Sequence, residues 1–234
     1  MSKSKGIFVT GTGTDIGKTF VTALLVKKLK EAGCRTAYFK AAVSGNLRDG
    51  SGRLIPGDAA YVKQISGISQ PLETMCPYIY ETAVSPHLAA RLEGGPVELE
   101  RVIGEYEKLC REYEYIICEG SGGILCPIRC DERFILLEDI IKALGLPAVI
   151  TADAGLGTIN SVVLTCEYMK ARGLEIRGII LNRFHKGDIM EEDNKAMCER
   201  MTGIPVIACA EENAADLDLP ADVLKEICDK GEKL

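Results

Sequence analysis

The sequence predicts an α/β fold with a single doubly wound, mainly parallel sheet and helices on both faces, formed by residues 1–234 as one domain. Strand-like and helix-like segments alternate from one end of the chain to the other, as in proteins built around a parallel sheet. The strand-like segments are nearly continuous apolar runs, which is typical of strands covered on both faces. Hydrophobic residues make up 47% of the 234 residues, so the chain can bury a substantial core.

Each predicted element follows from its local pattern of residues. The predicted strands are short apolar runs, and they cover residues 7–10, 35–40, 115–118, 148–151, 178–182 and 206–209. The predicted helices lie between these strands, and they cover residues 20–32, 96–112, 160–172 and 190–201. A further helix is expected to begin at Asp58, with this residue as its N-cap. Residues 44–57 and 71–86 are predicted to be irregular, since glycine and proline break longer elements there.

The charge balance argues against several classes of partner. The chain has 28 basic and 34 acidic residues, a net charge of −6 and a pI near 5.2. The lysines are scattered among glutamates, so nucleic acid and anionic membranes are not expected partners. Residues 1–5 lack an apolar export segment, and no apolar run approaches the ~18 residues that span a bilayer. The sequence therefore predicts a cytoplasmic protein.

Ten cysteines are spread along the chain, several of them inside apolar runs. A disulfide framework is not expected in a chain of this length without a signal peptide. Cys126 and Cys130 form the one close pair in the sequence. No second pair or neighbouring histidine completes a set of four metal ligands, so free thiols in a reducing compartment are the favoured interpretation.

The first predicted strand leads into a loop with the chemistry of a phosphate-binding site. Residues 6–19 read GIFVTGTGTDIGKT, in which a strand, a glycine-rich loop and a helix follow one another. The loop amides and the helix N-terminus present N–H donors to phosphate oxygens. Lys18 can reach the outer phosphates, and the hydroxyl of Thr19 can bind Mg²⁺.

The match to known glycine-loop patterns is incomplete. The strict phosphate-loop pattern G-x-x-x-x-G-K-[ST] requires glycine at position 12, where this chain has Thr12. The dinucleotide pattern G-x-G-x-x-G fails as well, because Ile16 stands where its third glycine belongs. An ordinary strand–turn–helix with a chance Gly-Lys-Thr sequence is the alternative interpretation.

Charged residues follow other predicted strands, at the sheet edge where ligands bind in folds of this type. Lys40 ends the second strand and supplies a second positive charge beside the loop; the alternative is a solvated surface lysine. Glu119 ends a strand and suits the Mg²⁺ side of a nucleotide site; the alternative is a loop or capping carboxylate. Asp58 is a third candidate ligand, with the helix cap as its alternative. Thr19, Asp58 and Glu119 suffice for Mg²⁺, which takes one or two carboxylates together with phosphates and water.

No constellation for a protein nucleophile is visible in the sequence. The two histidines, His87 and His185, lie near no serine or cysteine motif. Any reaction is therefore expected to depend on phosphate activation, lysine charge and positioning.

Further segments follow the loop in a fixed order: KAAVSG at 40–45, DA at 58–59, SPH at 85–87, EGSGG at 119–123 and LGTIN at 156–160. Together with VTGTGTDIGKT, these segments resemble the dethiobiotin synthetase family, the ATP-dependent ring-closing ligases of biotin biosynthesis. The family's patterns are VTGTDTxxGKT, K-P-V-x-[ST]-G, an acidic-Ala pair, S-P-H, E-G-A-G-G and L-G-x-I-N. The resemblance extends from Phe8 to about Ile207.

The resemblance implies a homodimer that uses ATP and Mg²⁺ to join CO₂ or bicarbonate to 7,8-diaminononanoate, through a carbamate and a carbamic-phosphoric anhydride. It implies catalytic roles for Lys40, Lys18 and Thr14. The implied ATP contacts come from the loop, from the two carboxylates, from the EGSGG segment and from the C-terminal half: Gly13, Thr14, Asp15, Ile16, Gly17, Lys18, Thr19, Asp58, Glu119, Gly120, Ser121, Gly122, Asn182 and Glu211.

Substrate contacts are implied as well. Ser44 is expected beside the carbamate and the diamine, and the substrate carboxylate is expected at the neighbouring subunit, where a helix N-terminus suits an anion. The residues implied at that helix N-terminus are Gly157, Thr158, Ile159 and Asn160. An ordinary first turn of a helix is the alternative for this segment.

Three positions depart from the family patterns. Gly13 replaces the usual aspartate of the loop, and Ala41 replaces the proline after Lys40, so both alter the cleft beside the expected carbamate site. Residues 210–213 lack the proline of the loop that closes over adenine. The choice of nucleotide is therefore left open.

Other functions stay compatible with the sequence. A related amide ligase, such as the nucleotide domain of cobyrinic or cobyric acid synthases, needs a glutaminase domain for which the 234 residues have no segment. A nucleotide-switch ATPase of the partitioning type carries a second lysine where this chain has Gly13, and a basic or amphipathic tail that is not visible here. A binding protein that has lost turnover is the third alternative.

Overall fold

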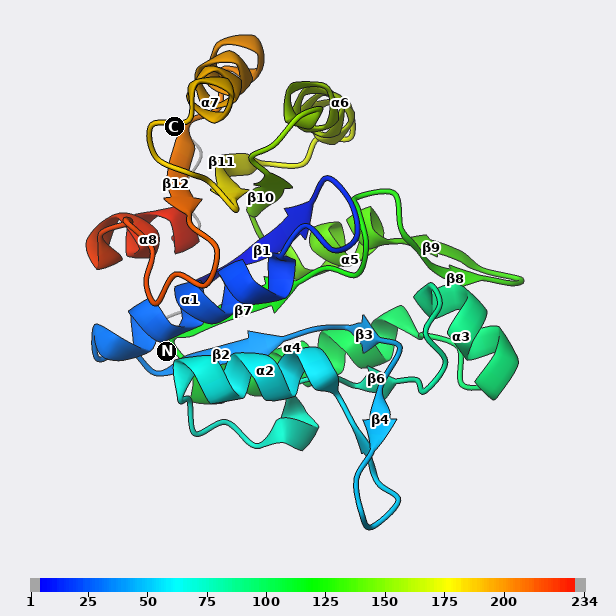
Figure 1. Ribbon diagram of the computed structural model, residues 1–234. Coiled ribbons are helices and arrows are strands. Elements are labelled where there is room, and N and C mark those ends of the chain that lie inside the picture. The colour runs from blue at the N-terminus through cyan, green and yellow to red at the C-terminus, as the bar shows by residue number, and fades with distance from the viewer. Residues whose placement is uncertain (1–4, 230–234) are drawn as a thin grey trace.

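A six-stranded parallel sheet forms the centre of the computed structural model, which describes residues 5–229 (Figure 1). The strands are β1 (Lys5–Gly11), β2 (Thr36–Phe39), β7 (Tyr115–Glu119), β10 (Ala148–Asp153), β11 (Ile176–Asn182) and β12 (Val206–Ala210). Their order across the sheet is β12-β11-β10-β1-β7-β2, and each neighbouring pair is parallel. The predicted fold class is therefore confirmed, and each predicted strand is present.

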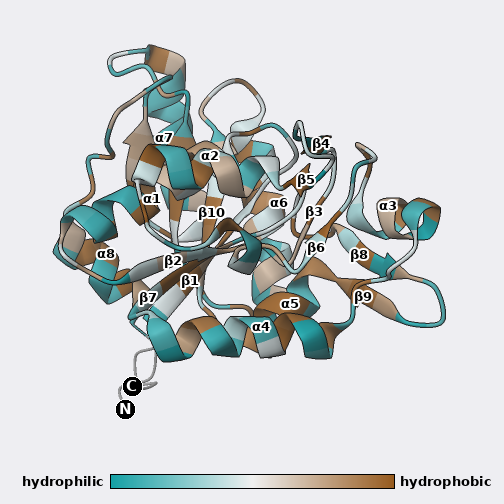
Figure 2. Cartoon of the chain, turned by 90° about the horizontal axis from the view of Figure 1, so that it is seen from below, coloured by the Kyte–Doolittle hydropathy of each residue, from teal (hydrophilic) through white to brown (hydrophobic). Residues whose placement is uncertain are grey.

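Helices cover both faces of this sheet. They are α1 (Lys18–Glu31), α2 (Gly57–Ser66), α3 (Pro86–Glu93), α4 (Leu99–Glu112), α5 (Leu137–Leu144), α6 (Thr158–Ala171), α7 (Ile189–Thr202) and α8 (Ala221–Cys228). Apolar side chains of α1, α2 and α8 share one buried cluster with one face of the sheet. Those of α4, α5, α6 and α7 belong to a second cluster on the opposite face. Figure 2 separates the layers, with α1 and α2 on one side of the strands and α4 and α5 on the other.

The elements predicted from the sequence do not include α3, α5, α8 or the small sheets. The small sheets pair β3 (Ala42–Val43) with β6 (Tyr78–Ile79), β4 (Leu47–Arg48) with β5 (Leu54–Ile55), and β8 (Pro127–Cys130) with β9 (Phe134–Leu136), and a 3-10 helix covers Leu72–Thr74. Strands this short carry no readable periodicity. Helix α5, in contrast, does carry a signal in the sequence, because Leu137, Ile140, Ile141 and Leu144 are buried at helical spacing.

The expectation that Asp58 caps α2 is wrong. The helix begins at Gly57, and Pro56 takes the N-cap position. Asp58 therefore lies inside the first turn, where a carboxylate is favoured by the positive end of the helix dipole. Its side chain is bonded to Lys40 rather than to the backbone of its own helix.

No disulfide joins any of the cysteines within residues 5–229. Cys126 directly precedes the extended strand β8, and Cys130 ends it. At ~3.3 Å per residue their Cα atoms are about 13 Å apart, which exceeds the ~7 Å that a disulfide can bridge. A disulfide within this pair would require β8 to unfold.

No helix in residues 5–229 is both long and apolar enough to cross a membrane.

A buried carboxylate, Glu138, ties α5 to α6 away from the strand ends. Its side chain is fully buried and accepts hydrogen bonds from Arg172 (2.7 Å), Tyr168 (2.6 Å) and Lys142 (3.0 Å). Burial by itself raises the pKa of Glu138, but these donors outweigh burial and lower the pKa from 4.5 to about 2. The charged form is thus strongly preferred in the folded protein.

Replacing Glu138 with glutamine is expected to lower the free energy of unfolding by about 2 kcal/mol at pH 7, because both cations lose their charged partner. Since the folded pKa lies below the unfolded one, this contribution is complete above pH 4.5 and is lost as the pH falls toward 2. Denaturant unfolding of the wild type and Glu138→Gln at pH 7, 4 and 3 measures it. A difference in stability that stays constant across this range would contradict the assignment.

Candidate active site

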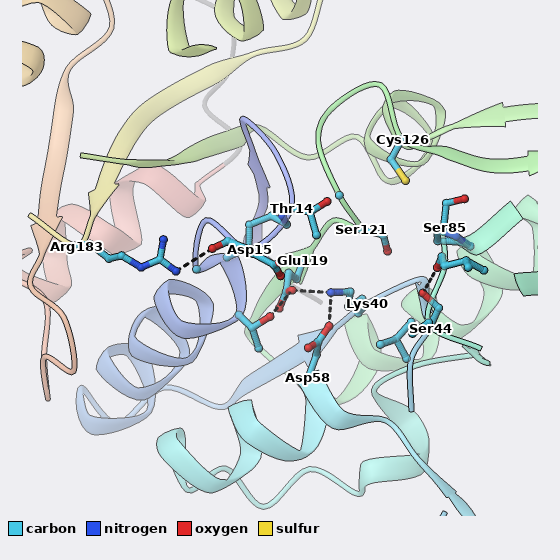
Figure 3. A pocket seen from close by; sticks show the side chains of 18 residues that line it. Thr14, Asp15, Lys40, Ser44, Asp58, Ser85, Glu119, Ser121, Cys126 and Arg183 are labelled. Carbon is cyan, nitrogen blue, oxygen red and sulfur yellow. Dashed lines mark hydrogen bonds and ion pairs between the residues drawn. The ribbon is translucent and has the colours of Figure 1, made fainter. Parts of the chain in front are cut away.

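A cavity of about 820 Å³ opens at the carboxyl ends of β1, β2 and β7 (Figure 3). Its walls are the loop before α1, the first turn of α2, the residues that lead into α3 and the segment after β7. Because the strands of the sheet are parallel, their carboxyl ends meet at one edge, and α1 begins there with its N-terminus toward the cavity. The cavity therefore lies where the sequence predicts a ligand site.

The loop between β1 and α1 is held in a compact conformation by its own residues. Lys18 turns back and donates to the carbonyl oxygen of Gly13 at 2.5 Å. Gly17 has a φ of +88°, and a Cβ atom there would collide with the amide nitrogen of Asn182. That nitrogen donates to the carbonyl of Ile16 at 3.0 Å. The glycine before the lysine is thus required twice, by its backbone angle and by the contact with Asn182.

The departures from glycine-loop patterns do not disturb this conformation. Among the described residues other than glycine, positive φ values occur at Asp15, Arg183 and Asn213, so Thr12 has an ordinary backbone angle and does not need to be glycine. A Cβ atom added to Gly13 would meet no other atom within 4 Å, and the φ of Gly13 is not positive. A side chain at position 13 would fit, so the missing aspartate leaves free space beside the loop.

Lys40 lies between two carboxylates at the centre of the cavity (Figure 3). Its ammonium group donates to Asp58 at 2.5 Å and to Glu119 at 2.6 Å. The Glu119 side chain is fully buried, and Lys40 is 6% exposed. The interpretation of Lys40 as a solvated surface lysine and that of Glu119 as a loop carboxylate are therefore wrong.

Glu119 is also held by two hydroxyl groups. Thr19 donates to its Oε1 atom at 2.8 Å, and Tyr38 donates to its Oε2 atom at 2.9 Å. Thr19 belongs to the first turn of α1, so the hydrogen bond joins the phosphate loop to the end of β7. Both oxygens of the carboxylate are thereby fixed in orientation.

The two lysines of the cavity have opposite electrostatic surroundings. Burial, together with the neighbouring charge of Lys40, lowers the pKa of Lys18 to about 8. Burial also acts to lower the pKa of Lys40, but the charges of Glu119 and Asp58 outweigh it and raise that pKa above its usual value. Lys40 is therefore a permanent cation, whereas Lys18 is a cation that can lose its proton in mildly alkaline solution.

The donor set at this point suits a hard divalent cation. Thr19, Asp58 and Glu119 offer only oxygen atoms, and two carboxylates with a hydroxyl leave positions for phosphate oxygens and water, as Mg²⁺ prefers. Within residues 5–229, no group of three or more His, Cys, Asp or Glu side chains is placed to hold a metal ion. These residues thus fit a metal that arrives with a polyphosphate.

Other predicted residues reach the same cavity from different elements. Thr14, Asp15, Gly17, Ser44, Ser121 and Gly122 contribute to its walls. The hydroxyl of Ser44 donates to the carbonyl of Val84, and that of Ser121 donates to the carbonyl of Ala42. Each hydroxyl oxygen keeps lone pairs for a ligand.

A second group of predicted residues lies outside the cavity wall: Gly13, Ile16, Gly120, Asn182, Glu211, Gly157, Thr158, Ile159 and Asn160. Asn182 is buried, and its Oδ1 atom has no hydrogen-bond partner in the described part of the chain. The hydroxyl of Thr158 is likewise buried and has no partner there. The segment from Gly157 to Asn160 does begin a helix, α6, with Gly157 as N-cap.

Several residues near the site are not predicted from the sequence patterns, among them four with polar or thiol side chains. Arg183 lines the cavity, and it donates to Asp153 (2.6 Å) and to the carbonyl of Asp15 (2.8 Å), which braces the loop. Cys126 and Ser85 line the wall opposite Arg183 (Figure 3). Tyr38 does not line the cavity, but its hydroxyl donates to Glu119. Ser85 belongs to the SPH segment and Arg183 follows Asn182, so their neighbourhoods carry a signal, whereas Cys126 and Tyr38 have none.

Comparison with known sequences gives a consistent result over nearly the whole chain. The family profile described as "AAA domain" matches residues 5–218. The ATP-dependent dethiobiotin synthetase BioD of Brachyspira hyodysenteriae is 48% identical over 216 residues, which cover 92% of this chain and 96% of that protein. The protein of the same name from Clostridium botulinum strain Eklund 17B is 43% identical over 226 residues, with 97% and 99% coverage.

Comparison with solved structures reports on the fold alone, because the identities are low. A MinC:MinD cell division protein complex from Aquifex aeolicus contains a chain with a TM-score of 0.59 and 14% identity, covering 99% of this chain and 98% of that one. A ParA family ATPase from Chlorobium tepidum matches with a TM-score of 0.52 and 14% identity, covering 91% and 86%. This chain therefore shares the fold of the chain from the MinC:MinD complex and of the ParA family ATPase.

Proposed function

This chain belongs to the family of ATP-dependent dethiobiotin synthetases, and we propose that it closes the cyclic urea of dethiobiotin from 7,8-diaminononanoate, CO₂ and ATP. One observation carries this proposal beyond the family name. The Lys40 ammonium lies 2.5 Å from Asp58 and 2.6 Å from Glu119, in the same cavity as Lys18 and Thr19. With a divalent cation on the two carboxylates, Lys40 and Lys18 would be available to neutralise the negative charges of a carbamate and a triphosphate.

The proposed reaction proceeds in three steps. One amine of the diamine takes up CO₂ and releases a proton, which forms a carbamate. A carbamate oxygen then attacks the γ-phosphorus of ATP, and ADP leaves with the electrons of the broken P–O bond. The second amine attacks the carbonyl carbon of the resulting carbamic-phosphoric anhydride. The ring closes as the amine loses a proton and phosphate leaves with the electrons of the broken C–O bond.

The side chains divide these tasks among them. We propose that the Lys18 ammonium leaves the Gly13 carbonyl when ATP binds and then holds the transferring phosphoryl group. Lys40 is proposed to neutralise the carbamate. The hydroxyls of Thr14 and Ser44 are proposed to position the carbamate and the diamine. The proposed reaction needs no protein nucleophile.

Thr19, Asp58 and Glu119 would hold Mg²⁺, and Mg²⁺ when bound would neutralise charge on the phosphates. Glu119 is presented to that position by the hydrogen bonds from Thr19 and Tyr38. In the structure Lys40 balances both carboxylates, so its ammonium is available to turn toward the carbamate when a second cation shares them.

Asn182 is proposed to contact the adenine base. Its amide nitrogen is committed to the carbonyl of Ile16, which leaves the unpaired Oδ1 atom as an acceptor. An exocyclic amino group, as in adenine, supplies the donor that this atom lacks. Glu211, in the loop after β12, is proposed to lie near the ribose and base.

The remaining parts of the proposal concern the assembly. We propose a homodimer of single-domain chains in the cytoplasm, with the substrate carboxylate bound at the N-terminus of α6 of the neighbouring subunit, at Gly157, Thr158, Ile159 and Asn160. The position of these residues outside the cavity of their own chain is compatible with that arrangement. Leu156, which precedes them, is 92% exposed.

The experiment that tests the function is an assay of phosphate release with diaminononanoate, bicarbonate, Mg²⁺ and a panel of nucleotides. Phosphate release that requires the diamine, together with formation of the cyclic urea by mass spectrometry, is the expected result. Phosphate release without the diamine would favour a switch ATPase of the partitioning type instead. No phosphate release with any nucleotide would favour a binding protein without turnover.

Nucleotide binding is expected to take up protons above pH 8. Lys18 has a pKa of about 8 in the free protein, and a bound polyphosphate would raise it, so affinity should fall as the pH rises above 8. Calorimetric titration with a non-hydrolysable ATP analogue at pH 7 and 8.5, in buffers of different ionisation enthalpy, measures the uptake. Lys18→Arg is the matched control, because arginine keeps its charge and should abolish the uptake. Equal uptake by both proteins would disprove the assignment to Lys18.

A further inference from the structure

The carboxylate of Glu119 has one oxygen toward the cavity and one oxygen toward the core. Oε1 accepts from Thr19 and from Lys40, both of which line the cavity. Oε2 accepts from the hydroxyl of Tyr38 at 2.9 Å, and Tyr38 is its only donor within residues 5–229. Tyr38 itself is fully buried and does not line the cavity.

The sheet register explains why Tyr38 meets Glu119. Tyr38 of β2 lies opposite Ile117 of β7, so Glu119 is two residues further along the neighbouring strand. Side chains two residues apart on a strand point to the same face, and diagonal neighbours on that face are within reach of an aromatic side chain. Tyr38 and Glu119 therefore share the α1 face of the sheet.

Tyr38 is in turn held by a buried amide. β2 is an edge strand, and the side chain of Gln70 pairs with both backbone groups of Tyr38: the Tyr38 N–H donates to Oε1 at 2.8 Å, and Nε2 donates to the Tyr38 carbonyl at 3.0 Å. Gln70 is fully buried, and it also donates to Thr74 at 3.1 Å. This contact replaces a missing neighbouring strand and fixes the backbone from which the tyrosine extends.

We infer that Tyr38 is a positioning residue for the metal-binding carboxylate, which it orients so that Oε1 of Glu119 faces the phosphate loop. This inference rests on the proposed function. A hydroxyl is suited to the task because it donates one hydrogen bond without neutralising the carboxylate, so the full negative charge stays available to a cation. Without that donor, Oε2 is left unpaired in the core, and the orientation of the carboxylate depends on the bonds of Thr19 and Lys40 to Oε1.

The test compares Tyr38→Phe with a matched control, Tyr80→Phe. Tyr80 is also buried, and its hydroxyl donates to the carbonyl of Gly95 at 2.7 Å, away from the cavity. Binding of Mn²⁺ to the complex with a non-hydrolysable ATP analogue is followed by electron paramagnetic resonance of the free ion. Tyr38→Phe is expected to weaken Mn²⁺ binding about tenfold, with no change in binding of the analogue in EDTA. Tyr80→Phe is expected to bind Mn²⁺ like the wild type.

Unchanged Mn²⁺ binding by Tyr38→Phe would overturn the inference. A loss of Mn²⁺ binding that Tyr80→Phe shares, or one matched by an equal loss of analogue binding in EDTA, would also overturn it, because the tyrosine would then act on general stability. The Mg²⁺ concentration for half-maximal phosphate release is measured alongside, with an expected rise of about tenfold for Tyr38→Phe. If the wild type fails to use the diamine, the proposed function fails, whereas the Mn²⁺ titration still decides the role of Tyr38.

Discussion

Replacing Lys40 with methionine is expected to lower kcat/KM for ring closure about 10³-fold, while nucleotide affinity stays close to that of the wild type. Lys40 is the cation proposed to neutralise the carbamate, whereas the phosphate contacts are proposed for Lys18 and the loop, which line the same cavity. Methionine keeps the length of the side chain and removes its charge. Diamine-dependent phosphate release measures the rate, and calorimetric titration with the ATP analogue measures binding.

Removing Lys40 also leaves two carboxylates without their common partner. Breaking a buried ion pair typically costs about 3–5 kcal/mol, so thermal unfolding of Lys40→Met has to be recorded with and without Mg²⁺. We expect Mg²⁺ to restore part of the lost stability, because a divalent cation can replace the ammonium between Asp58 and Glu119. Lys170→Met is the matched control, since Lys170 contacts Glu167 and the carbonyl of Thr202 on the surface. Normal turnover by Lys40→Met would remove Lys40 from the mechanism.

Replacing Glu119 with glutamine is expected to lower kcat at least 10²-fold at a fixed Mg²⁺ concentration and to raise the Mg²⁺ requirement. The substitution keeps the shape of the side chain and removes one of two proposed metal-binding charges. It also removes the partner of Lys40, which then pairs with Asp58 alone. Initial rates across a range of Mg²⁺ concentrations separate the loss of metal binding from a loss of maximal rate.

Glu138→Gln provides the control for Glu119→Gln. Both glutamates have fully buried side chains paired with cations, but Glu138 lies between α5 and α6, outside the cavity wall. Glu138→Gln should therefore lose stability and keep its Mg²⁺ dependence. If Glu119→Gln behaves in the same way, with an unchanged Mg²⁺ requirement, Glu119 has a structural role only.

The central sheet and its helices could be predicted because their signals are local. Each strand of the sheet contains a short apolar run, and α4 carries a periodic pattern that extends over several turns. The hairpin of β8 and β9 could not be predicted, since its strands have three or four residues and Phe134 is 65% exposed. Such a hairpin is defined by its pairing and by its contact with the rest of the chain, not by its own pattern.

The order of residues is enough to predict the phosphate loop, the strand-end residues Lys40 and Glu119, and the parallel strands that bring them to one edge. How these groups share charge follows only from the folded arrangement. The lysine bridges Asp58 and Glu119 rather than facing solvent, and Asp58 lies inside its helix instead of capping it. Tyr38 has no motif at all, because its role depends on the register of β2 against β7 and on Gln70 from another segment. Contacts of this kind join side chains that are far apart in the sequence, so the spacing of residues along the chain does not predict them.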